Sequence, residues 1–116
     1  MLTLSIKKQW YDMLVSGEKK EEYREIKPYY TKRFQKIVAP YYLDENDFWQ
    51  RMWLEECHIV GWYEDELFDV KFRNGYSANA PEFKAKVCLS VGKGKPEWGA
   101  EKDKEYYILT IKEIYK

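Results

Sequence analysis

The sequence has few of the residues that build metal or disulfide sites. Its 116 residues include one histidine, His58, and two cysteines, Cys57 and Cys88, which form no Cys-x-x-Cys pair. Zinc needs three or four ligands at defined spacing, so we expect no metal ion and no cofactor. Two isolated cysteines of this kind are typical of reduced, buried thiols in a cytoplasmic protein.

Long apolar runs are also missing. No segment approaches the roughly 20 apolar residues of a membrane-spanning helix. The first residues contain no basic segment followed by an apolar one, so we expect no signal peptide. These absences predict a cytoplasmic protein that does not act at a membrane.

A net charge is absent too, since 20 Lys and Arg residues balance 20 Asp and Glu residues. This excludes a simple polycation for nucleic acid. The charges are nevertheless segregated: residues 41–70 hold nine acidic residues and one arginine, whereas the flanking segments are basic. The pattern predicts a basic body with an acidic insertion, whose carboxylates form a solvated face, cover a basic site, or bind a protein partner.

Hydrophobic periodicity predicts one α+β domain over residues 1–116. Alternating apolar residues predict strands at residues 2–6, 21–26, 69–73, 83–91 and 106–114. Helical spacing predicts two helices, at 8–16 and, after Pro28, at 29–36, and an acidic, aromatic helical insertion at about 39–67. About five strands with a single core and few helices favour a small β-barrel over a doubly wound sheet.

The most informative stretch is residues 17–24, between the first helix and the second strand. Gly17 is a typical residue just past a helix end, because it adopts positive φ without a Cβ clash. Glu22 and Arg24 are two apart in a strand, so they share a face, and Lys19 at the turn can reach over it. This predicts a cluster of these three side chains, which is either a binding or catalytic site or an ion-pair network of small energetic value.

A second group of candidates combines aromatic and basic side chains. Aromatic rings stack on unpaired bases, and lysines contact phosphates. The residues that fit this role, unless their rings only pack the barrel rim, are Arg73, Tyr76, Lys93, Lys95 and Trp98.

The pattern Gly17-x-Lys19-x-x-Glu22-x-Arg24 resembles the signature of the ASCH (activating signal cointegrator homology) domain family. Further blocks, at residues 4–7, 27–30, 70–76, 92–94 and 96–99, are similar to its small stand-alone members, often from phages or prophages. The resemblance covers residues 2–36 and 68–115. It implies a PUA-like β-barrel with a cleft lined by the signature residues and a role in binding RNA or nucleotides.

Some members of this family are enzymes, either amidohydrolases of acylated cytidine or ribonucleases. In the amidohydrolase branch the lysine that matches Lys19 is catalytic, and a threonine stands where this chain has Glu22. The resemblance therefore implies that Lys19 is catalytic. This chain departs from the amidohydrolase pattern at Glu22, which weakens the transfer of that activity.

Three functions follow from these patterns. In the leading one, an RNA- or nucleotide-binding domain, Glu22 and Arg24 recognise a base while Lys19 contacts a phosphate or carbonyl. In the first alternative, a hydrolase of N-acylated cytidine-type nucleosides or of RNA, Lys19 and Glu22 are catalytic. The second alternative is a protein-interaction module or homodimer, which would use an aromatic helix face at residues 47–57 formed by Phe48, Trp49, Met52 and Trp53.

Overall fold

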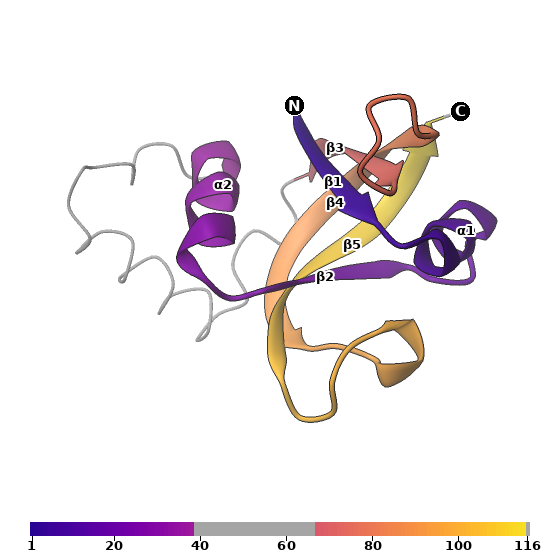
Figure 1. Ribbon diagram of the computed structural model, residues 1–116. Coiled ribbons are helices and arrows are strands. Elements are labelled where there is room, and N and C mark those ends of the chain that lie inside the picture. The colour runs from indigo at the N-terminus through magenta and orange to yellow at the C-terminus, as the bar shows by residue number, and fades with distance from the viewer. Residues whose placement is uncertain (39–66, 116) are drawn as a thin grey trace.

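A curled β-sheet with two helices beside it forms the described part of the chain (Figure 1). The computed structural model describes residues 1–38 and 67–115. In chain order its elements are β1 (Leu2–Ile6), α1 (Lys8–Ser16), β2 (Glu21–Glu25), α2 (Pro28–Val38), β3 (Leu67–Asn74), β4 (Glu82–Lys93), the short 3₁₀ helix η2 (Pro96–Trp98) and β5 (Glu105–Tyr115).

The five strands lie in the order β1-β3-β4-β5-β2. β1 pairs with β3 in parallel, and the other three pairings are antiparallel. β4 and β5 are long, curved strands that lie side by side (Figure 1), and a register shift between Lys86 and Val87 adds to the bend. The curl brings the two edge strands close to each other, so that Arg24 Nη2 of β2 donates a hydrogen bond of 3.0 Å to Ser5 O of β1. This half-barrel confirms the predicted α+β, barrel-like fold.

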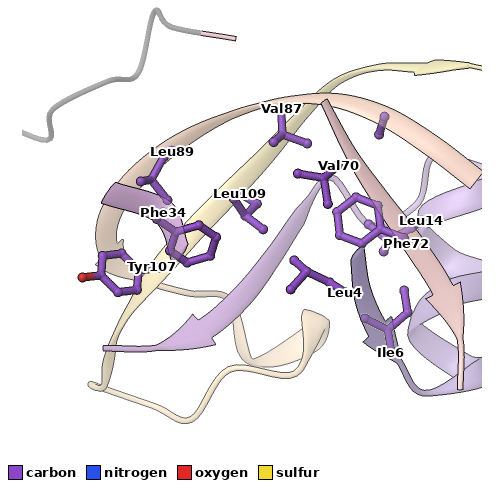
Figure 2. Close-up of a cluster of buried hydrophobic side chains, with 11 residues drawn as sticks. Leu4, Ile6, Leu14, Phe34, Val70, Phe72, Val87, Leu89, Tyr107 and Leu109 are labelled. Carbon is purple, nitrogen blue, oxygen red and sulfur yellow. The ribbon is translucent and has the colours of Figure 1, made fainter. Parts of the chain in front are cut away.

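The hydrophobic core fills the concave side of the curled sheet. Figure 2 shows side chains from β1, β3, β4 and β5 pointing toward one another, with Leu14 of α1 and Phe34 of α2 completing the cluster. Strand alternation explains the pattern, since the fully buried residues of β4 and β5 are two apart: Ala85, Val87 and Leu89, and Tyr107 and Leu109. A smaller cluster of Tyr23, Ala100, Tyr106 and Ile108 is buried separately and supports the site described below.

Local signals place the elements near their predicted positions. Pro28 begins α2, and Gly17 ends α1 in the left-handed conformation with φ of 84°. Gly75 has φ of 90° in the turn that follows β3. β3 and β4 are longer than predicted, because each continues along its neighbour in the sheet.

The predicted insertion at 39–67 lies almost wholly on residues 39–66, outside the described residues. The proposed aromatic helix at 47–57, Cys57 and His58 lie there as well. Cys88 is described, and it is a buried free thiol. Among the described helices, none has the length and apolar character needed to cross a bilayer.

Candidate functional site

A cleft of about 400 Å³ opens along β2. Its floor is formed by the three charged side chains predicted to cluster, Lys19, Glu22 and Arg24. Aromatic rings from α1, β2, η2 and β5 surround the floor: Trp10, Tyr23, Trp98 and Tyr106. Buried charges enclosed by aromatic rings are costly for a fold, so this arrangement is a candidate functional site.

The turn after α1 directs Lys19 into the cleft. The N–H of Gly17 donates to Leu14 O at 3.2 Å, and the N–H of Lys19 donates to Met13 O at 3.0 Å. The chain therefore reverses within a few residues and joins the sheet, where Lys20 O accepts a 2.9 Å bond from the N–H of Ile111. Gly17 thus ends the helix where Lys19 can turn inward.

Lys19 is a buried ammonium group, since only 1% of the residue is exposed. Its Nζ donates to Glu22 Oε1 at 3.2 Å and to the backbone carbonyl of Trp98. The same Nζ lies 4.7 Å from the centre of the Trp10 ring and 5.3 Å from that of Tyr23. Burial lowers the pKa of Lys19, and the Glu22 carboxylate opposes this effect.

Glu22 uses only one of its two carboxylate oxygens within the protein. Oε1 accepts from Lys19 Nζ and, at 2.9 Å, from the N–H of Tyr23. Oε2 is buried and has no hydrogen-bond partner among the described residues, although the side chain lines the cleft. A buried carboxylate oxygen without a donor is costly, so a ligand N–H that reached Oε2 from the cleft would relieve this cost.

A ligand-binding arginine needs donors that are free, whereas both terminal nitrogens of the Arg24 guanidinium donate to backbone carbonyls. Its Nη1 donates to Tyr23 O at 2.8 Å, and its Nη2 donates to Ser5 O at 3.0 Å. Nη1 also lies 3.6 Å from Glu22 Oε1. Arg24 therefore joins the two edge strands at the cleft floor, and its charge lies close to the Glu22 carboxylate.

The rim combines exposed aromatic and charged side chains. Tyr76, at the turn after β3, is 91% exposed and lines the cleft. Lys7 and Lys27 add positive charge, and Glu25 and Glu101 add negative charge. The rim is therefore close to neutral, whereas the floor holds two cations and one carboxylate.

The structure brings together five of the eight predicted site residues, Lys19, Glu22, Arg24, Tyr76 and Trp98. The other three do not line the cleft formed by the described residues. Arg73 pairs with Glu82 at 3.1 Å, Lys93 lies 3.7 Å from Asp103, and Lys95 Nζ lies over the Trp98 ring at 4.3 Å.

Several cleft residues were not singled out from the sequence as site residues. Trp10 fits the apolar face of α1, and its role over Lys19 depends on the turn that brings the lysine back under it. Tyr23 lies between Glu22 and Arg24 in β2, so strand alternation directs its side chain to the opposite face, yet its ring also lines the cleft. Its hydroxyl donates to Glu21 Oε1 at 2.7 Å and accepts from the N–H of Lys95 at 2.9 Å, and burial raises its pKa.

Gly94 lies where the backbone passes close to the Tyr23 ring. A Cβ at this position would lie 2.6 Å from Ala100 Cβ and 2.8 Å from two carbons of the Tyr23 ring. We expect Gly94→Ala to lower the free energy of unfolding by about 2 kcal/mol, because overpacking displaces the ring. Gly92→Ala is the matched control, since its Cβ meets only Ile108 at 3.5 Å. Urea denaturation measures both, and equal losses would contradict the expectation.

The chain was also compared with known proteins. No protein-family model matches it, no curated protein matches it, and no solved structure matches it. The function is therefore inferred from the chemistry of the cleft.

Proposed function

We propose that this chain is an ASCH-type, PUA-like domain whose cleft binds one base of a nucleotide or of single-stranded RNA. The observation that carries the proposal is the unpartnered oxygen of Glu22 at the cleft floor. Lys19 and the N–H of Tyr23 hold the other oxygen in place, so the orientation of Oε2 is fixed before a ligand arrives. A fixed acceptor favours a ligand that presents an N–H donor.

The walls of the cleft favour a planar ligand. The rings of Trp10, Trp98 and Tyr106 surround the floor, and aromatic faces stack on nucleobases at about 1–3 kcal/mol per base. Adenine, cytosine and guanine carry an amino group that can donate to Glu22 while the ring stacks. Uracil has only its ring N–H for this role, so we expect it to bind more weakly than the bases with amino groups.

Phosphate contacts make a smaller contribution to this proposal. Lys7 and Lys27 lie at the rim, but Glu25 lies 4.0 Å from Lys27 and partly offsets its charge. The affinity should therefore fall with salt by a logarithmic slope of about 1 to 2, far below that of proteins that contact many phosphates. Recognition would come mainly from the base.

Glu22→Gln should weaken binding of cytidine, adenosine or guanosine by about 10- to 100-fold. The amide oxygen can replace Oε1, which leaves an amide N–H₂ donor facing the ligand's own donor. Isothermal titration calorimetry, or quenching of tryptophan fluorescence, measures the dissociation constants. Glu82→Gln is the matched control, because Glu82 also pairs with basic side chains but lies outside the cleft. Unchanged affinity in Glu22→Gln would overturn the proposal.

Hydrolysis of an N-acylated cytidine is the second candidate function. The lowered pKa of Lys19 favours it, because a lysine that loses its proton more easily can act as a base. In this reaction neutral Lys19 takes a proton from a water that Glu22 Oε2 orients, and the water oxygen attacks the acyl carbon; Lys19 then returns the proton to the N4 nitrogen as the C–N bond breaks, so that cytidine leaves with a neutral amino group. Incubation of the wild type and of Lys19→Met with N4-acetylcytidine tests this second function. Release of cytidine and acetate that is lost in Lys19→Met supports a hydrolase, and binding without products supports the binding domain.

A further inference from the structure

A second hollow, of about 260 Å³, adjoins the cleft. It lies between the first residues of β1 and helix α2. The two hollows share four lining residues, Ser5, Arg24, Tyr30 and Tyr76. A chain-like ligand that leaves the cleft past Tyr76 would therefore enter the second hollow directly.

The second hollow exposes two aromatic rings. Tyr76 is 91% exposed and lines both hollows, and Tyr29 is 53% exposed and lines only the second. The Tyr29 ring stands edge-on against Tyr30, with 5.0 Å between the ring centres and an angle of 86° between the planes. This contact fixes the Tyr29 ring while leaving much of it exposed, as in surfaces that stack unpaired bases.

The charge of the second hollow is positive. Arg33 and Arg24 line it, and none of the described residues around it is acidic. The guanidinium of Arg33 lies 3.4 Å from the centre of the Tyr29 ring, and its Nη1 donates to Tyr29 O at 2.9 Å. Helix α2 also carries Lys32 and Lys36 and contains no acidic residue. An arginine held over a ring, with donors still exposed, suits a phosphate group.

We propose that this hollow is a second nucleotide subsite, so that the ligand is a single-stranded oligonucleotide rather than a mononucleotide. The inference rests on the proposed function of the cleft. One base occupies the cleft, the neighbouring base stacks on Tyr29 and Tyr76, and the phosphate next to it contacts Arg33. A nucleic acid fits better than an acidic peptide, because the positive hollow continues into a cleft with aromatic walls and a buried hydrogen-bond acceptor.

Fluorescence anisotropy with labelled ligands tests this proposal on the full chain. The ligands are a mononucleotide and single-stranded oligonucleotides of roughly six nucleotides, as RNA and as DNA. The wild type should bind the oligonucleotide at least about 10-fold more tightly than the mononucleotide of the same base. Arg33→Gln should remove about 5- to 10-fold of the oligonucleotide affinity, lower the salt slope by about 1, and leave mononucleotide affinity unchanged.

Two further variants make the result specific to this surface. Tyr29→Ser should reduce oligonucleotide affinity in the same way, through loss of stacking. Lys84→Gln is the matched control and should change nothing, because Lys84 also lies over a tyrosine ring, that of Tyr115, at 5.5 Å but lines neither hollow.

The outcomes separate the two proposals. If the mononucleotide binds as tightly as the oligonucleotide, and Arg33→Gln changes neither affinity, the second subsite is wrong and the cleft proposal stands. If no ligand binds the wild type, both proposals are wrong. Equal binding of RNA and DNA supports a subsite that reads base and phosphate, and a preference for RNA supports one that also contacts the 2′-hydroxyl.

Discussion

Lys19→Met is expected to lower the free energy of unfolding by about 3–5 kcal/mol, because it leaves a buried carboxylate without its ammonium partner. Lys19 is 1% exposed and Glu22 is 5% exposed, so neither charge is well solvated. Methionine has nearly the length of lysine, which makes loss of the charge and of two hydrogen bonds the main change. Arg24, with Nη1 at 3.6 Å from Glu22 Oε1, remains but cannot replace the direct contact. Urea denaturation measures the loss.

The double variant Lys19→Met/Glu22→Gln is the control for this interpretation. It removes both charges of the Lys19–Glu22 pair, the amide oxygen can still accept from the N–H of Tyr23, and Arg24 keeps its two carbonyl acceptors. The double variant should therefore be more stable than Lys19→Met alone, since removing both charges costs less than removing one. If the stability losses of Lys19→Met and Glu22→Gln simply add in the double variant, the two charges do not interact at the cleft floor.

The pH dependence of stability gives Lys19 a second signature. Its pKa is lowered in the folded protein, mainly by burial, so at alkaline pH the unfolded chain binds more protons at this site than the folded one. Lys19 therefore makes the stability rise with pH up to the unfolded value of about 10.4. The difference in unfolding free energy between the wild type and Lys19→Met should widen as the pH rises toward the unfolded pKa of about 10.4.

Taking the difference between the wild type and Lys19→Met also removes an opposing effect of Tyr23 on the pH dependence of stability. Burial raises the pKa of Tyr23, so the folded state keeps its phenolic proton above about pH 10 while the unfolded chain loses it. Stability then falls with rising pH in both proteins, and the fall cancels in the difference. A difference that stays constant with pH would show that the Lys19 pKa is the same in both states.

Local rules explain why much of the fold could be predicted from the sequence. Helix α1 ends at Gly17 because the left-handed conformation suits a residue without Cβ, and α2 begins at Pro28 because proline fits the first turn. The strands follow period-two alternation, which sets which side chains enter the core. The grouping of Lys19, Glu22 and Arg24 was predictable for the same reason, since all three lie within one turn and one short strand.

The residues that were not predicted depend on contacts between distant segments. Trp98 was chosen as a stacking ring, but its backbone carbonyl also accepts from Lys19, a contact made across 79 residues. Trp10 enters the site because the turn at Gly17 folds Lys19 back beneath it. Arg73 and Lys93 carry the positive charge expected of phosphate-binding residues. Each, however, lies near a carboxylate, which the strand register brings to Arg73 and the loop path brings to Lys93.

Arg24 shows how the same limit affects the assignment of a role. From the sequence it is a ligand-binding arginine, because a planar fork of donors suits phosphate or guanine. In the structure two of those donors are used by backbone carbonyls, Tyr23 O in its own strand and Ser5 O in the opposite edge strand. The closing of the sheet that brings Ser5 there is a property of all five strands, and no local pattern contains it.

Arg24→Leu should accordingly reduce stability by about 3 kcal/mol or more, since it removes two charge-assisted hydrogen bonds and one cation near Glu22. The loss should concentrate where the edges meet. Hydrogen–deuterium exchange, measured by mass spectrometry, should speed up in β1 and β2 more than in the paired centre of β4 and β5.

Two variants separate bridging from charge. Arg24→Lys keeps the positive charge near Glu22 but cannot span two carbonyls in fixed directions, so it should recover only part of the lost stability. Arg33→Leu is the matched control, because Arg33 donates to a carbonyl within its own helix and is exposed, and its loss should stay below about 0.5 kcal/mol. Full recovery by lysine, or exchange that rises evenly over all strands, would mean that Arg24 acts only through its charge and does not hold the edges of the half-barrel together.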